Sequence, residues 1–253
     1  DSTKGWLPLE DDVAADEPEQ PPTQKGIFGY GYTASSDVSM TNLVNSSGVI
    51  ATDVTGVGTA RSQLAAANYG GDKAIFAYGS TSGGVVSLSN LVSNSGVVAS
   101  DVTGVGSARR ILAAAGYGGV GVNKAIFGYG TTGSYVSMSN LVSSSGVVAT
   151  DTPGVGTARA PLAAASYGSD KAIFGYGDTG SNVSLTNLVN SSGVVASDVS
   201  GVGTARKFLA ATTYGTDKAI FGYGEDSGGK VSMTNLVTNA GVVGTDVTGV
   251  GTG

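Results

Sequence analysis

Four residue types in this 253-residue chain recur at fixed places of a repeated segment: arginine, aspartate, asparagine and tyrosine. Their types and spacing make them the candidates for binding or catalysis. Four arginines follow a Thr/Ser-Ala pair, and five aspartates each open an Asp-x-x-Gly-Val-Gly turn. Guanidinium groups in a ring suit an anionic ligand, and oxygen-rich turns suit Ca²⁺. Cysteine and histidine are absent, which excludes thiolate and imidazole metal sites, thiol nucleophiles and a Ser-His-Asp triad.

Each recurrent position also has a structural interpretation, which we favour. The five donors of an arginine suit bonds from one repeat to carbonyls of the next. One carboxylate per turn falls short of the six to eight ligands that Ca²⁺ needs, so we expect each aspartate to cap its own turn and we expect no metal or cofactor. Asparagine is disfavoured inside a strand, which indicates a hydrogen bond shared between repeats. The positions are Arg61, Arg109, Arg159 and Arg206; Asp53, Asp101, Asp151, Asp198 and Asp246; and Asn42, Asn90, Asn140, Asn187 and Asn235.

Tyrosine recurs in a Gly-Tyr-Gly segment, which reads Ala-Tyr-Gly in the second copy, at Tyr30, Tyr78, Tyr129, Tyr176 and Tyr223. These rings could stack on sugars, but we favour buried spacers whose hydroxyl reaches a backbone partner. The loop after each tyrosine varies, and variable loops on a rigid frame are where recognition usually lies. The loops are short and rich in Gly and Ser, so plain connections are the alternative. The candidate ligand-binding residues in them are Tyr32, Asp37, Tyr135, Asp178, Asn182, Glu225 and Asp226.

The repeat itself begins with Lys-Ala-Ile-Phe-Gly-Tyr-Gly or a near copy and returns every 47 to 51 residues, at Lys25, Lys73, Lys124, Lys171 and Lys218. Within residues 59–106, apolar runs between turn signals predict four strands, at 64–69, 73–79, 86–92 and 97–100. Alternation along the second strand places Phe76 and Tyr78 on one face and Ile75 on the other. Such a sheet is apolar on both faces, so the copies must cover one another.

Radial stacking of these sheets predicts an all-β fold, a β-propeller of five four-stranded blades over residues 25–253. The small Leu-Ala-Ala-Ala strand fits nearest the axis, where blades converge. A linear β-solenoid is the alternative, but it does not explain why one strand alone is so small. The first blade lacks its own innermost strand, because that strand occurs only before the other four copies. An open strand edge is costly, so we expect the N-terminal arm, a neighbouring subunit or further sequence to fill it.

The repeat resembles the kelch family of propellers. The residues that carry the likeness are Thr59-Ala60-Arg61, Leu64 to Ala67, Gly70-Gly71, Ile75-Phe76 and Gly79. The kelch glycine pair is replaced by Gly-Tyr-Gly, and the late tryptophan of kelch units is missing from every copy. The amino-acid sequence of the repeats is also similar to that of repeats in structural or tail proteins of bacteriophages, especially marine ones. Kelch-like copper oxidases need ligands that a chain without His and Cys lacks, so we expect no enzyme.

The charge of the chain is concentrated in residues 1–24, an arm with a net charge of −6, whereas residues 25–253 are neutral. A neutral body and an acidic arm argue against a nucleic-acid partner. No apolar run is long enough to span a membrane. The arm is acidic and rich in proline and does not fold alone. Its apolar residues Trp6, Leu7 and Leu9 suit docking on another subunit, or else packing on their own propeller.

Together these features predict a non-enzymatic structural or adhesion protein of a virion, a surface or tail component at the virion surface or outside the cell. It would contact other virion or surface subunits through the arm, as part of an oligomeric assembly, and a host receptor or glycan through its loops. A multivalent carbohydrate-binding propeller lectin at a cell surface is the alternative, because each blade could offer a shallow sugar site.

Overall fold

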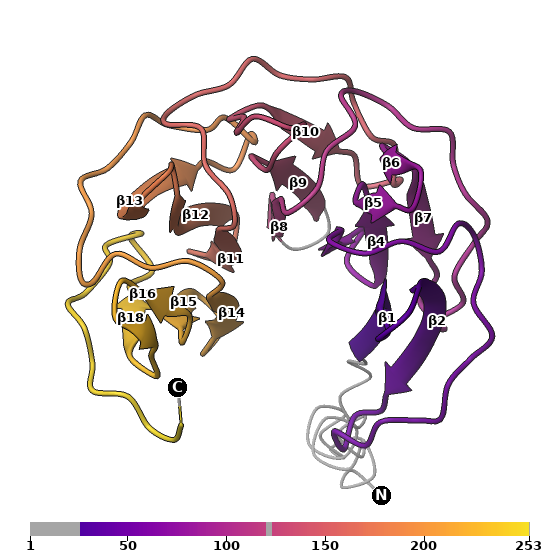
Figure 1. Cartoon of the computed structure of the whole chain (residues 1–253), viewed down its shortest axis with the longest axis horizontal. Coiled ribbons are helices and arrows are strands. Elements are labelled where there is room, and N and C mark those ends of the chain that lie inside the picture. The colour runs from indigo at the N-terminus through magenta and orange to yellow at the C-terminus, as the bar shows by residue number, and fades with distance from the viewer. Residues whose placement is uncertain (1–25, 120–122, 253) are drawn as a thin grey trace, which may run out of the picture.

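The described part of the chain is all-β. The structure, a computed structural model, describes residues 26–119 and 123–252, and within them it contains strands and no helix. Five units, each built around one copy of the repeat, follow one another along an open arc, with unit 1 and unit 5 at its two ends (Figure 1).

Unit 1 is a two-stranded hairpin, and units 2 to 5 each contain a three-stranded antiparallel sheet. Unit 1 consists of β1 (Gly26–Tyr32) and β2 (Asp37–Val44), and unit 2 of β3 (Ala65–Tyr69), β4 (Lys73–Ala77) and β7 (Ser89–Val92). Unit 3 consists of β8 (Ala113–Tyr117), β9 (Lys124–Gly128) and β10 (Ser139–Val142), and unit 4 of β11 (Ala163–Tyr167), β12 (Lys171–Asp178) and β13 (Asn182–Val189). Unit 5 consists of β14 (Ala210–Tyr214), β15 (Lys218–Gly222) and β18 (Thr234–Val237). Small hairpins add β5 (Ser80–Thr81) with β6 (Gly84–Val85), and β16 (Glu225–Asp226) with β17 (Gly229–Lys230).

The small-residue strands β8, β11 and β14 lie on the inner side of the arc (Figure 1). Short side chains let these strands approach one another across unit boundaries. Ser166 of β11 donates a hydrogen bond of 2.8 Å to the Gly116 carbonyl of β8, and Thr213 of β14 donates one of 3.0 Å to the Ser166 carbonyl. Polar contacts therefore link three successive inner strands.

The fourth strand expected at residues 97–100 is not a continuous strand. Residues 97–102 touch the third strand through isolated bridges, Val92 with Val98 and Ser89 with Val102. Between the bridges, the Ala99 carbonyl accepts a hydrogen bond of 3.0 Å from the Asn90 side chain. In a regular antiparallel ladder the Ala99 carbonyl would accept from a backbone N–H of the third strand. Because the Asn90 side chain bonds it instead, the outer segment stays irregular.

The face predicted for Tyr78 is wrong, because the tyrosine interrupts the alternation of its strand. All five recurrent tyrosines have φ between 62° and 65°, in the left-handed region. Tyr78 consequently packs with Ile75 against Phe127 of the next unit, whereas Phe76 packs against Tyr30 of the preceding unit. In units 1 and 4 the same place is a register shift of the hairpin, the irregularity that a β-bulge produces.

The apolar core lies between the units. A tyrosine of each unit meets a phenylalanine of the next, as in the Tyr129–Phe174 pair, whose ring centroids are 5.1 Å apart. Gly128, just before Tyr129, permits this approach, since a Cβ there would lie 2.7 Å from the Phe174 ring. Each of units 2 to 4 therefore packs against a core on both of its faces. Units 1 and 5, at the ends of the arc, each have one face that no described unit covers.

Unit 1 differs from the others at its inner edge. Among the described residues β1 pairs only with β2, and no strand lies on its other edge. Phe28 of β1 is 60% exposed, whereas its counterpart Phe76 in unit 2 is 4% exposed. Because the structure describes no residue before Gly26, the filling of this edge stays a prediction.

Candidate functional site

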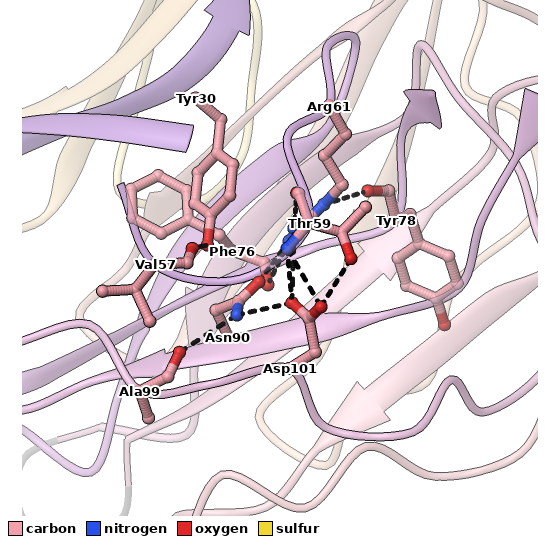
Figure 2. A network of polar contacts seen from close by, with 9 residues as sticks. All are labelled: Tyr30, Val57, Thr59, Arg61, Phe76, Tyr78, Asn90, Ala99 and Asp101. Carbon is pink, nitrogen blue, oxygen red and sulfur yellow. Dashed lines mark hydrogen bonds and ion pairs between the residues drawn. The ribbon is translucent and has the colours of Figure 1, made fainter. Parts of the chain in front are cut away.

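The four recurrent arginines lie at the boundaries between units. In the first copy (Figure 2), Arg61 donates from Nε to the Tyr78 carbonyl at 2.8 Å and from Nη2 to Asn90 Oδ1 at 2.7 Å. Its Nη1 donates to the Thr59 carbonyl at 3.1 Å. The guanidinium carbon also lies 4.3 Å from the centroid of the Tyr30 ring in unit 1. One side chain therefore joins two units.

Asn90 and Asp101 complete this network. Asn90 donates from Nδ2 to Asp101 Oδ1 at 2.9 Å. Asp101 in turn accepts hydrogen bonds from the Thr59 backbone N–H at 2.9 Å and from Thr59 Oγ1 at 2.6 Å. The expectation that the aspartate caps its own turn is wrong, because it binds a residue 42 positions earlier. Gly58 allows this contact, since a Cβ at its φ of 75° would lie 2.3 Å from Asp101 Oδ1.

The same network occurs in each of units 2 to 5. Its copies are Thr59, Arg61, Asn90 and Asp101; Ser107, Arg109, Asn140 and Asp151; Thr157, Arg159, Asn187 and Asp198; and Thr204, Arg206, Asn235 and Asp246. The copies are not identical, because Asn140 Oδ1 is buried without a hydrogen-bond partner among the described residues, while Arg109 Nη2 donates to the Phe127 carbonyl at 3.5 Å. The Thr or Ser of each copy was not singled out from the sequence, although its fixed place before Ala-Arg was the available signal.

Burial and hydrogen bonding set the protonation of this network. Burial lowers the pKa of the Arg61 guanidinium. Burial alone would raise the pKa of Asp101, but hydrogen bonds from Thr59 and Asn90 outweigh it and lower that pKa. All four arginines have no exposed surface. Their charges are therefore directed at protein oxygens and not at solvent, where an anionic ligand would have to meet them.

The recurrent tyrosines use their hydroxyls for the backbone. Tyr129 donates to the Val155 carbonyl at 3.2 Å and Tyr176 to the Val202 carbonyl at 3.1 Å. Burial raises the pKa of each of these two hydroxyls to about 12. Tyr223 of unit 5 makes the same bond to Val250, but its ring is 47% exposed. Four rings are thus enclosed between units and the fifth is open to solvent.

The candidate loop residues come together at the hairpins of units 4 and 5. Asp178, Asn182, Glu225 and Asp226 line a shallow pocket of about 440 Å³ between these two units. Asn182 donates from Nδ2 to the Glu225 carbonyl at 3.1 Å across the boundary. Lys207 also lines the pocket. It was not singled out from the sequence, because nothing in its neighbourhood marks it as close to Asp178.

Asp178 is the most enclosed side chain of this pocket. It accepts hydrogen bonds from the Gly180 N–H at 2.7 Å, Tyr135 Oη at 3.1 Å and Lys207 Nζ at 3.2 Å. Burial alone would raise its pKa, but these three donors outweigh burial and lower it. Asp178 therefore stays ionised and fixed in position, as a hydrogen-bond acceptor for a ligand would have to be.

The other predicted positions do not join this pocket. Tyr32 and Asp37 face each other across the hairpin of unit 1, at the opposite end of the arc. Tyr32 is 66% exposed, and Asp37 Oδ1 is buried without a hydrogen-bond partner among the described residues. Trp6, Leu7 and Leu9 of the arm lie outside the described residues.

Within residues 26–119 and 123–252, no three Asp or Glu side chains gather in a way that could hold a metal ion. The same residues contain no helix with the length and hydropathy needed to cross a membrane. No protein-family model matches the chain, and no curated protein matches it either.

Proposed function

We propose that the chain is a non-enzymatic structural or adhesion protein of a virion surface or tail. The observation that carries this proposal is that the recurring polar side chains hold the fold together and do not face a ligand. The buried arginines bond protein oxygens at every boundary between units. The side chains that vary lie on hairpins outside this network. A frame of constant contacts with varied loops is suited to presenting a surface to a partner.

We further propose that the frame is a kelch-like five-bladed propeller. The inner position of the small-residue strands and the cores between units support this, since converging blades need small side chains near the axis. A closed wheel would bring unit 5 against unit 1. Electron cryo-microscopy of the native assembly tests this, and an arc that stays open in the assembly would contradict it.

The arm is proposed to attach this frame to other virion or surface subunits. The sequence of the arm is acidic and rich in proline, and Trp6, Leu7 and Leu9 are large apolar residues of the kind that suit a partner surface. Deleting residues 1–24 should abolish assembly and leave the thermal unfolding of the body unchanged. A substitution of Trp6 by Ala in the full chain is the finer test. Normal assembly of both variants would refute this role of the arm.

A multivalent lectin is the second candidate, and the pocket between units 4 and 5 is the observation that favours it. A fixed carboxylate, an amide and a nearby aromatic ring are groups that bind sugar hydroxyls and faces. A glycan array separates the two proposals. Binding to one sugar class that is lost in Asp178→Asn and kept in Asp72→Asn supports the lectin, and silence on the array supports the structural protein.

A further inference from the structure

Unit 1 contains the asparagine and the aspartate of the arginine network, which accept from the arginine and the Thr or Ser in the other units. Among the described residues it has no such arginine, Thr or Ser, which are the donors of the network. Asn42 donates from Nδ2 to Asp53 Oδ1 at 2.7 Å and to the Ala51 carbonyl at 3.1 Å. Asn90 makes the equivalent bonds to Asp101 and Ala99 in unit 2. The clamp of asparagine and aspartate is therefore formed in unit 1 as well, although no described arginine reaches it.

The donor half in units 2 to 5 is one stretch of chain, the entry segment, which runs from the Thr or Ser before the arginine to the end of the small-residue strand. The four entry segments are residues 59–69, 107–117, 157–167 and 204–214. Each supplies a hydroxyl and an N–H to the aspartate, a guanidinium to the asparagine or the tyrosine carbonyl, and a strand to the sheet edge. All four serve their own units, so none is available to unit 1.

The surface left in unit 1 matches these groups. Asp53 is exposed and negatively charged, and Asn42 Oδ1 is the counterpart of the oxygen that Arg61 binds in unit 2. On the edge of β1 that corresponds to the β3 edge of β4, no strand of the described residues pairs with the backbone groups. Phe28, at 60% exposure, lies where Phe76 packs beside Leu64 of an entry segment. Within residues 26–119 and 123–252, the backbone edge of β1, the charge of Asp53 and the ring of Phe28 thus all lack the partners that their counterparts have in unit 2.

We propose that unit 1 is a binding site for an extended polypeptide segment of the form Thr/Ser-Ala-Arg-x-x-Leu-Ala-Ala, which adds as a strand to the free edge of β1. Its arginine lies against Asn42 and the Tyr30 carbonyl, and its Thr or Ser binds Asp53. Backbone pairing supplies general affinity, and the arginine supplies specificity. The partner is identified by this motif, whichever protein presents it. The site goes beyond the proposed function and does not depend on it.

The test uses a fluorescent synthetic peptide with the sequence of residues 59–69 and the full chain. Anisotropy should report saturable binding at one site. A peptide in which the arginine is replaced by Ala should bind about tenfold or more weakly, because a charge-assisted hydrogen bond is lost. A peptide with Lys at that position should also bind more weakly, because an ammonium cannot make the forked contacts of a guanidinium.

Protein variants locate the site. Asp53→Asn and Asn42→Ala should each weaken binding of the 59–69 peptide, while Asp226→Asn in unit 5 should not. Unit 1 lies at one end of the arc, so circular dichroism and thermal unfolding are expected to show that these variants still fold. Equally tight binding of the peptide to the Asp53→Asn variant and to the natural chain would overturn the proposal. The peptide would then be binding elsewhere, for example by replacing the entry segment of another unit.

A further variant lacks residues 1–24. Equal binding to the full chain and to this variant supports the proposal. Binding only after the deletion would overturn it, because the arm itself would then be the occupant of the edge. Failure of the peptide to bind either protein would overturn it as well. Neither result bears on virion assembly or on glycan binding, which test the proposed function separately.

Discussion

The guanidinium carbon of Arg159 lies 4.4 Å from the centroid of the Tyr129 ring, although the arginine enters unit 4 and the tyrosine belongs to unit 3. The same ring meets Phe174 of unit 4 at a centroid distance of 5.1 Å. Away from water a cation–π contact contributes about 2 kcal/mol or more. Stability is thus shared between neighbouring units, as in other repeat proteins.

Arg159→Ala should destabilise the protein by about 3 to 5 kcal/mol, because it leaves buried polar partners without their charge-assisted bonds. Arg159 bonds the Tyr176 carbonyl at 2.8 Å and Asn187 Oδ1 at 2.7 Å. Urea unfolding measures the change as a lower midpoint. Arg110→Ala is the matched control, since Arg110 is exposed. Equal midpoints for the two variants would contradict the prediction.

Gly156→Ala should cost more stability than Gly48→Ala, although both glycines have nearly the same backbone. Their φ angles are 75° and 77°, so the conformational penalty of about 1 to 2 kcal/mol is shared. A Cβ at Gly156 would lie 2.3 Å from Asp198 Oδ1, whereas nothing lies within 4 Å at Gly48. The clash should add about 1 to 3 kcal/mol. Thermal unfolding of the two variants side by side measures this difference.

Alkaline pH should destabilise the fold through its buried tyrosines. The folded pKa of Tyr129 and Tyr176 is about 12, and the ordinary value is 10.0. Their contribution is therefore complete below pH 10 and is lost as pH rises toward 12, because the unfolded chain releases these protons first. The unfolding free energy should fall across that window. Tyr129→Phe should show a smaller fall, and an unchanged slope would argue against the assignment.

Acid should destabilise the fold through the network aspartates. Hydrogen bonds lower the pKa of Asp101, Asp151, Asp198 and Asp246 despite some burial. Their contribution is present above the unfolded pKa near 3.9 and is lost as pH falls below it. Asp198→Asn should be less stable at neutral pH and should lose less on acidification. Asp226→Asn serves as the control, and urea midpoints over the acid range provide the measurement.

The arrangement of strands in a unit was largely readable from the sequence, whereas the details at two positions were not. Runs such as Ala65–Tyr69 and Lys73–Ala77 form strands, as predicted, because turn residues bound them and their apolar side chains are buried once the strands pair. Tyr78 breaks the alternation with a φ of 65°, which L-residues rarely adopt. Gly79 after it, and the glycines on both sides of the tyrosine in the other four copies, were the signal for an irregular backbone, but periodicity alone does not say which way the ring turns.

The polar network was recognised only as separate positions. The sequence places an asparagine and an aspartate at fixed points of all five repeats and an arginine before four of them, and it indicates structural roles for these residues. It does not reveal that Asp101 reaches Thr59, because that contact spans 42 residues and depends on how the chain that enters unit 2 lies against the end of the same unit. Four residues that line the pocket, Asp178, Asn182, Glu225 and Asp226, were candidates from the sequence. Their gathering in one place and the part of Lys207 were missed, because Lys207 enters the pocket from the following unit.

The two ends of the arc are unlike, and this gives the molecule a polarity. Every interior boundary places a tyrosine of one unit on a phenylalanine of the next, but Tyr223 is 47% exposed at one end and Phe28 is 60% exposed at the other. Contact between such ends is heterologous, head to tail. It closes a single chain on itself or links successive copies in one direction, and it does not produce a two-fold symmetric pair.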